Sequence, residues 1–200
     1  MNGSIINHVA LAAALVLPLA AQETWQIDSG HSSAQFAVKH MMVSTVRGHF
    51  GKIAGTVKYD PKAPEKSYVE AVIDVNTIDT REAKRDAHLK SADFFDVEKF
   101  PAMTFKSTRA QAAGPGKLKL TGDLTMHGVT KSVTFDVEGP SAPVADGKGG
   151  FKSGASATAK IKRSEFGLTW NRVLEAGGVS VSDEVALTID IQLNKTGKGS

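Results

Sequence analysis

The stretch Glu184–Asn194, EVALTIDIQLN, decides the fold class of this chain. Every odd position from Val185 to Leu193 is a large apolar residue, whereas the even positions carry Glu, Ala, Thr, Asp, Gln and Asn. Successive residues of a strand point to opposite faces, so this period of two describes a strand with one face in a core and the other in water. We therefore predict a half-buried β-strand here.

The same alternation extends towards the amino terminus through most of the chain. It predicts further strands at about 24–28, 31–40, 47–59, 67–75, 102–110, 117–126, 131–138 and 151–163. Gly48, Gly51 and Gly55 fall inside one of them, and glycine within a strand often marks a bend, as in a sheet that curls towards closure. This spacing is typical of an all-β fold, an up-and-down antiparallel barrel or sandwich of about eight strands, in a single domain over residues 22–200.

One segment, Thr80–Asp96 (TREAKRDAHLKSADFFD), does not alternate. It reads as a short helical insert over about residues 80–96, and Asp79 or Thr80 can cap its amino terminus. The rings of Phe94, Phe95 and Phe100 would close one end of the barrel. A second small helical piece is expected at about 164–168.

Composition excludes several classes of protein. The 200 residues include no cysteine, which rules out disulfides, thiolate metal sites and cysteine nucleophiles. The net charge is only +3, and the Lys and Arg residues are spread along the strands instead of being concentrated on one element as in nucleic-acid binders. We therefore expect no nucleic-acid partner.

The catalytic and metal-binding motifs that can be read from sequence are also missing. Histidines 31, 40, 49, 88 and 127 do not form the HExxH spacing of a zinc site. Serine is plentiful, but there is no GxSxG turn, no GxGxxG and no P-loop. We expect structural histidines, no metal, no cofactor and no catalytic residues, so the protein is not expected to be an enzyme.

The amino terminus carries an uncharged apolar run, Val9–Ala20 (VALAAALVLPLA), followed by Ala21. It resembles a secretory signal peptide over residues 1–21, and it is shorter than the roughly 20 apolar residues of a membrane span. We expect a cleaved signal and no stable membrane span in the mature protein. The leader before this run has no Lys or Arg, so a hydrophobic anchor or a mis-set start codon stays open.

Small residues occupy several positions in phase with the apolar faces of the strands. They are Gly55, Ala71, Ser107, Gly122, Ala155, Ala157 and Ala159. An interior packed at native density would ordinarily use larger side chains, so these residues indicate either a cavity or places where the insert or a partner chain packs closely. The sequence leaves both interpretations open.

Five stretches together resemble the YceI-like family of polyisoprenoid-binding proteins. They are DSGHSSAQFAVKH (28–40), VRGHFGKIAGTVKYD (46–60), IDTREAKRDAHLKSADFFDVEKFPAMTFKST (78–108), LTGDLTMHGVTKSV (120–133) and KIKRSEFGLTW (160–170). The resemblance implies a lipocalin-like, eight-stranded antiparallel barrel, export to the periplasm and a homodimer. It also implies that the barrel binds a long apolar chain such as a polyisoprenoid, an isoprenoid quinone or a fatty amide.

On this basis we expect a ligand tail in the barrel and its head group at the mouth. The expected wall residues are Phe36, Val38, Ile73, Phe105, Leu124, Phe135 and Ile189. The expected mouth residues, donors to a phosphate, quinone carbonyl or amide, are Arg81, Arg85, His88 and Arg163. Two alternatives stay open: a stress-protective or partner-binding barrel with a filled core, and an enzyme that uses His88 or Asp86 beside a cavity.

Overall fold

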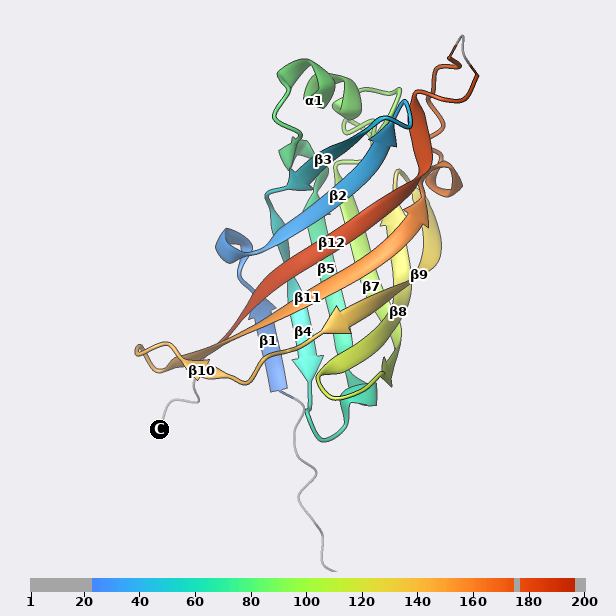
Figure 1. The fold of residues 1–200 in the computed structure, drawn as a ribbon. Helices are drawn as coiled ribbons and strands as arrows, with labels where there is room; N and C mark the ends of the chain where they lie inside the picture. The colour runs from blue at the N-terminus through green and yellow to red at the C-terminus, as the bar shows by residue number, and fades with distance from the viewer. Residues whose placement is uncertain (1–22, 175–176, 197–200) are drawn as a thin grey trace, which may run out of the picture.

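The computed structural model describes residues 23–174 and 177–196, so the expected signal peptide over residues 1–21 lies outside the described residues. The described chain is almost entirely β-structure, with one α-helix and four short 3-10 helices (Figure 1). The strands are β1 (Glu23–Ile27), β2 (Ser33–His40), β3 (Ser44–Phe50), β4 (Ile53–Tyr59), β5 (Tyr68–Asp74), β6 (Ile78–Asp79), β7 (Ala102–Ala112), β8 (Lys117–Met126), β9 (Val129–Glu138), β10 (Val144–Ala145), β11 (Gly150–Lys162) and β12 (Val181–Thr196).

Eight of these strands form a closed antiparallel ring. Its order is β1, β4, β5, β7, β8, β9, β11 and β12, and β12 closes the ring by pairing with both β11 and β1. The expected all-β, eight-stranded antiparallel barrel is therefore confirmed. A closed ring leaves none of these strands as a free edge, and it encloses the apolar face of each one.

Three of the barrel strands are bent, and their upper halves are separate strands. β2 continues β1 beyond a 3-10 turn (Ser29–His31), and β6 continues β5 beyond another (Val75–Thr77). The predicted single strand over 47–59 is wrong, because the chain breaks at Gly51 and Lys52 between β3 and β4. β2, β3 and β6 pair in that order outward from the first half of β12. The barrel wall therefore opens between β6 and β7 at its upper end.

The insert between β6 and β7 lies over this upper end (Figure 1). Its helix α1 spans only Ala83–Lys90, shorter than the predicted 80–96. The expected cap is also wrong, because the Glu82 carboxylate accepts hydrogen bonds from the backbone N–H groups of Lys84 and Arg85. Asp79 instead binds the backbone N–H of Arg81, a residue with a φ of 63°, so regular helix cannot begin before Glu82.

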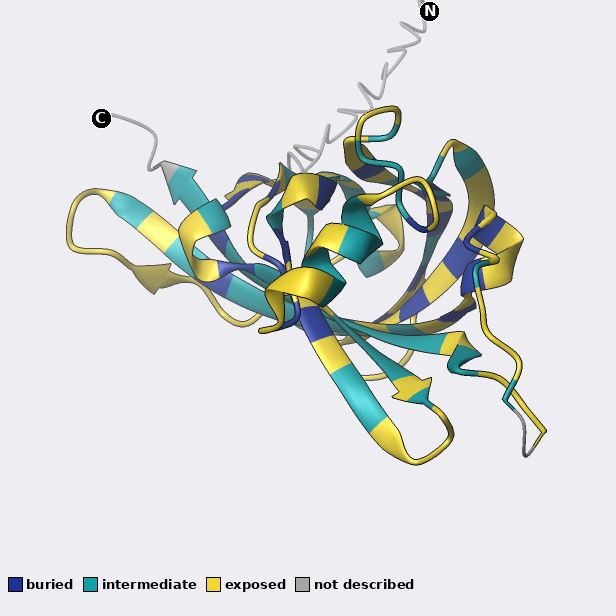
Figure 2. Cartoon of the chain, turned by 90° about the horizontal axis from the view of Figure 1, so that it is seen from above, coloured by how far each residue is buried: buried dark blue, intermediate teal, exposed yellow. Residues whose placement is uncertain are grey.

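The predicted second helical piece is the 3-10 helix Arg163–Phe166, which ends at Gly167 with a φ of 79°. The stretch 139–150 contains the short strand β10, which pairs with the start of β11. Buried and exposed residues alternate along strands such as β8, and Figure 2 shows this alternation as changes of colour along the ribbons. Within residues 23–174 and 177–196, no helix is long and apolar enough to cross a membrane.

Candidate functional site: the barrel interior

The barrel encloses an apolar cavity of about 230 Å³. Tyr59 and Leu118 line it at the lower end, where β4 ends and β8 begins. Leu89, Phe94 and Phe95 of the insert line it at the upper end. Inward side chains such as Phe36, Phe105 and Ile189 are only partly buried although they face the interior. The barrel is therefore hollow along its axis.

The chemistry of the cavity is that of a hydrocarbon solvent. Almost all of its lining side chains are aliphatic or aromatic, and those with polar groups are Gln35, Tyr59, Ser67, Ser156 and Arg163. No His, Asp or Glu is among the described residues that line it. Burying a charge without a partner is costly, so the interior favours an apolar guest. A cavity of about 150 Å³ holds benzene, so this one holds roughly nine or ten carbons, or about two isoprene units.

All seven predicted wall residues line the cavity. They come from six strands: Phe36 and Val38 from β2, and Ile73, Phe105, Leu124, Phe135 and Ile189 from β5, β7, β8, β9 and β12. The rings of Phe105 and Phe135 meet edge to face, with centroids 5.3 Å apart. Strand parity alone therefore locates these residues on the inner surface, whereas their contact with a ligand stays a prediction.

The small inward residues have two different causes. Ala71, Ala155 and Ala157 line the cavity and leave space in it. Gly122 instead allows two strands to approach closely, because a Cβ atom there would lie 2.5 Å from the carbonyl oxygen of Lys106. Ser107 lies at a bulge in β7, where its hydroxyl accepts a hydrogen bond from the Val69 N–H. The cavity accounts for Ala71, Ala155 and Ala157, whereas Ala159 does not line it and packs against the core, and backbone geometry accounts for Gly122 and Ser107.

Of the four predicted mouth residues, only Arg163 lines the cavity. Its buried guanidinium donates hydrogen bonds to the backbone carbonyls of Ser182, Leu168 and Val181. Burial lowers the pKa of the Arg163 guanidinium, while the nearby Asp183 carboxylate acts in the opposite direction. Arg163 therefore ties the 3-10 helix that it begins to the start of β12.

The other three predicted mouth residues are at the upper end but do not line the cavity. Arg85 donates to the side-chain and backbone oxygens of Thr80, at 2.7 and 2.8 Å. Arg81 is exposed. His88 lies 2.8 Å from the Asp93 carboxylate, and its ring packs edge-on against Phe94 and Trp170. Their contact with a head group stays a prediction.

Three residues that sequence reasoning missed complete the upper end: Trp170, Leu168 and Val181. Phe94 and Trp170 pack with ring centroids 5.1 Å apart, which joins the insert to the segment after the Arg163–Phe166 helix. Leu168 and Val181, from the same region, also line the cavity. The expected closure by aromatic rings is thus made by Phe94 and Phe95, whereas Phe100 packs on His127. The apolar residues after Arg163 had no strand pattern that would reveal them.

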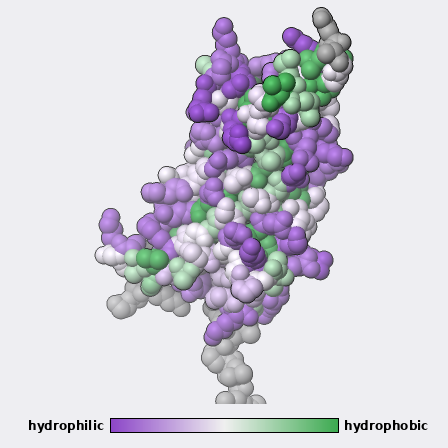
Figure 3. Space-filling model, in the orientation of Figure 1, coloured by the Kyte–Doolittle hydropathy of each residue, from purple (hydrophilic) through white to green (hydrophobic). Residues whose placement is uncertain are grey.

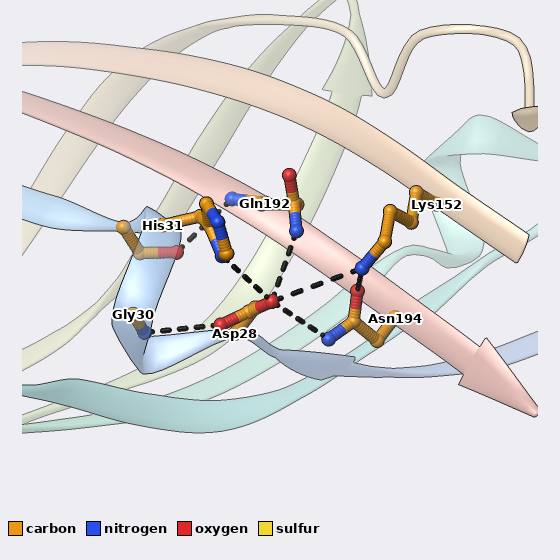
Figure 4. A network of polar contacts seen from close by, with 7 residues as sticks. Asp28, Gly30, His31, Lys152, Gln192 and Asn194 are labelled. Atoms are coloured by element: carbon orange, nitrogen blue, oxygen red, sulfur yellow. Dashed lines mark hydrogen bonds and ion pairs between the residues drawn. The ribbon is translucent and has the colours of Figure 1, made fainter. Parts of the chain in front are cut away.

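A polar network at the lower half holds the seam where the ring closes (Figure 4). Asp28 accepts hydrogen bonds from the side chains of Asn194 and Gln192 on β12, and it lies 3.9 Å from the Lys152 ammonium on β11. The hydrogen bond from Asn194 is the main cause that lowers the Asp28 pKa to about 2, with smaller contributions from His31 and the Gly30 N–H against the effect of burial. This network joins the turn after β1 to β11 and β12.

No group of three or more His, Cys, Asp or Glu side chains able to hold a metal ion occurs among the described residues. His31 contacts Asp28, His88 contacts Asp93, and His127 contacts the carbonyl of Phe166. These three histidines thus have separate structural partners.

Comparisons with known proteins agree with this architecture. A UPF0312 protein of Vibrio parahaemolyticus is 40% identical over 159 residues, which cover 78% of this chain and 84% of the relative. The crystal structure of BcnA from Burkholderia cenocepacia superposes with a TM-score of 0.71 at 26% identity, covering 83% of this chain and 98% of that one.

A polyisoprenoid binding domain from Saccharophagus degradans, implicated in plant cell wall breakdown, has the same fold. It superposes with a TM-score of 0.60 at 16% identity and covers 86% of this chain and 98% of that one. The sequence profile of the YceI-like domain matches residues 25–193, which is nearly the whole described chain. The chain therefore belongs to the YceI-like family.

Proposed function

We propose that the protein binds a long-chain apolar lipid inside the barrel and sequesters or carries it. The enclosed apolar cavity of about 230 Å³ is the observation that carries this proposal. The name of the Saccharophagus degradans domain supports an isoprenoid tail. A polyisoprenoid, an isoprenoid quinone and a fatty amide share the long hydrocarbon chain that such a cavity favours.

The cavity volume limits how much of such a tail is enclosed. Roughly nine or ten buried carbons contribute about 7–8 kcal/mol, at about 0.8 kcal/mol for each CH₂ group. Association costs about 4–15 kcal/mol in lost freedom of motion. Two enclosed isoprene units therefore give weak binding at best, and a tight ligand needs further carbons that widen the barrel or extend beyond one of its ends.

The head group is proposed to lie at the upper end, near Arg81, Arg85, His88 and Arg163. Arg81 and His88 are the more accessible donors, because Arg163 is buried and already donates to three carbonyls. Arg85 would have to exchange its bonds with Thr80 for bonds to a ligand. Alanine at all four positions should lower the affinity of the protein for a lipid with a charged head group. Unchanged affinity would contradict this assignment.

Binding without catalysis fits the lining residues better than an enzyme does. Acid–base chemistry most often uses a His, Asp or Glu at hydrogen-bond distance from the reacting atom, and the titratable side chains that line the cavity are instead Tyr59 and Arg163. A barrel with a filled core does not fit a cavity of this size. Export to the periplasm and a homodimer remain proposals that rest on family resemblance.

Mass spectrometry of an organic extract of the purified full chain tests the proposal. A reproducible long-chain lipid, absent from an unrelated protein purified from the same cells, is expected. Conversion of a supplied lipid to a new product would favour the enzyme. Absence of any lipid, together with no binding of isoprenoid alcohols in solution, would contradict the proposal and favour a partner-binding domain.

A further inference from the structure

Five exposed apolar side chains lie together at the upper end of the barrel. Met42, Val43 and Val173 are 68%, 85% and 81% exposed, and Met41 and Val179 are also exposed. We call this set, Met41, Met42, Val43, Val173 and Val179, the apolar rim. Single exposed apolar residues are common in soluble proteins, but a group of large ones indicates an interaction surface.

The apolar rim is built from two hairpins that are hydrogen-bonded to each other. Met41 to Val43 form the turn between β2 and β3. Val173 and Val179 bridge each other across a second hairpin, which the structure describes at residues 171–174 and 177–180. The Met41 N–H donates to the Ser180 carbonyl at 2.8 Å, and His40 pairs with Val181. Figure 2 shows the β2–β3 hairpin and the described arms of the second hairpin projecting on the same side beyond the barrel wall, and Figure 3 shows apolar side chains gathered at this upper end.

The turn at Met41 and Met42 adopts a backbone conformation that these residues disfavour. Their φ angles are 51° and 58°, and the Val43 N–H closes the turn on the His40 carbonyl at 3.0 Å. Two central residues with positive φ are typical of a type I′ hairpin turn, for which Asn-Gly is the favoured sequence. Two exposed methionines here combine a strained backbone with unburied apolar surface, so folding alone does not explain them.

The second hairpin has a fixed base beneath its exposed apolar residues. The Asn171 side chain donates to the Val181 carbonyl at 2.7 Å and accepts from the Val181 N–H at 3.0 Å. Val181 lines the cavity, and so does Val38, two residues before His40. Apolar surface therefore continues from the rim into the barrel.

Two cationic side chains of the described residues lie beside the rim without a carboxylate partner. Lys39 and Arg172 are exposed, and neither forms an ion pair with a carboxylate in the described part of the chain. Two carboxylates of the described chain at the start of β12 have other partners, since Asp183 accepts hydrogen bonds from Ser164 and Glu184 pairs with Lys160. Exposed apolar side chains flanked by free cations complement the surface of a bilayer with anionic head groups.

We propose that the apolar rim docks the protein on an anionic lipid bilayer, with the barrel mouth facing the membrane. This inference rests on the proposed function, because docking in this orientation would let an apolar tail pass between bilayer and cavity without crossing water. The contact is peripheral: a few side chains enter the head-group region, and no element spans the membrane.

The decisive variant is Met41→Asn/Met42→Gly in the full chain. Asn-Gly suits the turn, so the fold should be kept or made more stable while two apolar anchors are lost. Flotation with vesicles of phosphatidylcholine containing phosphatidylglycerol should show binding at least about tenfold weaker than wild type. Lys39→Gln/Arg172→Gln should reduce the affinity for these vesicles about fivefold for each charge removed. The reduction should be smaller with vesicles of pure phosphatidylcholine.

The matched control is Val144→Ser, which removes a side chain that is 66% exposed on β10, at the opposite end of the barrel (Figure 1). It should bind vesicles like wild type. Equal vesicle binding by Met41→Asn/Met42→Gly and wild type would overturn the proposal. So would conversion of a dimer to a monomer by that variant with vesicle binding unchanged, because the rim would then bind a second copy of this chain.

The docking proposal and the proposed function can fail separately. Binding of a fluorescent isoprenoid in vesicle-free buffer reports on the cavity, and Met41→Asn/Met42→Gly should leave it unchanged. A wild-type protein that binds the isoprenoid but neither type of vesicle would overturn the docking proposal alone. A protein that binds vesicles through the rim and never takes up the isoprenoid would support docking and contradict the proposed function.

Discussion

Filling the cavity from within should displace the ligand, and Ala157 is the position to fill. Ala157 lies on β11 between Val137 of β9 and Ile189 of β12, and all three residues line the cavity. The substitution Ala157→Phe adds one phenyl ring to the interior. Benzene occupies an apolar cavity of about 150 Å³, so the ring would take up roughly two-thirds of the available 230 Å³.

The lost volume translates into a large loss of affinity. The ring would exclude roughly six ligand carbons from the cavity. Their lost burial would weaken the free energy of binding by about 5 kcal/mol, at about 0.8 kcal/mol for each CH₂ group. Relaxation of the barrel will reduce this figure, but a loss of at least about a hundredfold is expected. Titration with a fluorescent isoprenoid, followed by fluorescence or calorimetry, measures it directly.

A matched control places the same ring outside the barrel. Ala54 on β4 is exposed and pairs with the exposed Val72, so Ala54→Phe should leave isoprenoid affinity unchanged. The ligand-free Ala157→Phe protein should be as stable as wild type or gain about 0.5–2 kcal/mol, because the ring fills empty space. Undiminished affinity in a correctly folded Ala157→Phe protein would refute binding in the barrel interior.

Three further predictions concern stability. Met41→Asn/Met42→Gly should raise the free energy of unfolding by about 1–2 kcal/mol by relieving positive-φ strain, and a lower melting temperature would contradict this reading of the turn. The pKa of Asp28 is about 2 in the folded protein, against an ordinary value of 3.8, so the ionised carboxylate stabilises the fold. Because the side chain is 19% exposed, this adds at most about 2 kcal/mol to the free energy of unfolding. The contribution is complete above pH 4 and is lost as the pH falls towards 2. Urea unfolding of Asp28→Asn should lack this pH dependence, and an unchanged slope would argue against the network. Arg163→Met should lower the free energy of unfolding by about 2–4 kcal/mol, because it leaves three backbone carbonyls without their donor. Arg163→Lys should have a stability between those of wild type and Arg163→Met. A loss below about 1 kcal/mol for Arg163→Met would show that water replaces the guanidinium.

Strand parity was enough to predict an all-β fold and the inner faces of its strands, whereas the choice of a closed barrel over a sandwich rested on the family resemblance. The alternation of Val185 to Leu193 holds in the structure, where all five odd positions line the cavity. A period of two is a local property of the chain, and it requires no knowledge of which strands become neighbours. The same reasoning found inward residues on five other strands.

Features that depend on contacts between distant segments could not be predicted in this way. The break at Gly51 and the burial of Thr80 against Asp86 depend on how the insert meets the bent strands, whereas the Glu82 cap is a local contact that the choice of Asp79 or Thr80 overlooked. Arg163 looked like a donor for a head group, but residues 5, 18 and 19 positions further along the chain take up its hydrogen bonds. The apolar rim likewise exists only because two hairpins about 130 residues apart lie side by side.

A crystal structure of the protein loaded with a short isoprenoid alcohol tests the central claim most directly. Our account predicts continuous ligand density along the barrel axis, in contact with Ala157 and Ile189 and below Phe94 and Phe95. Ligand density only on the outer surface, with the interior filled by water or by rearranged side chains, would contradict it.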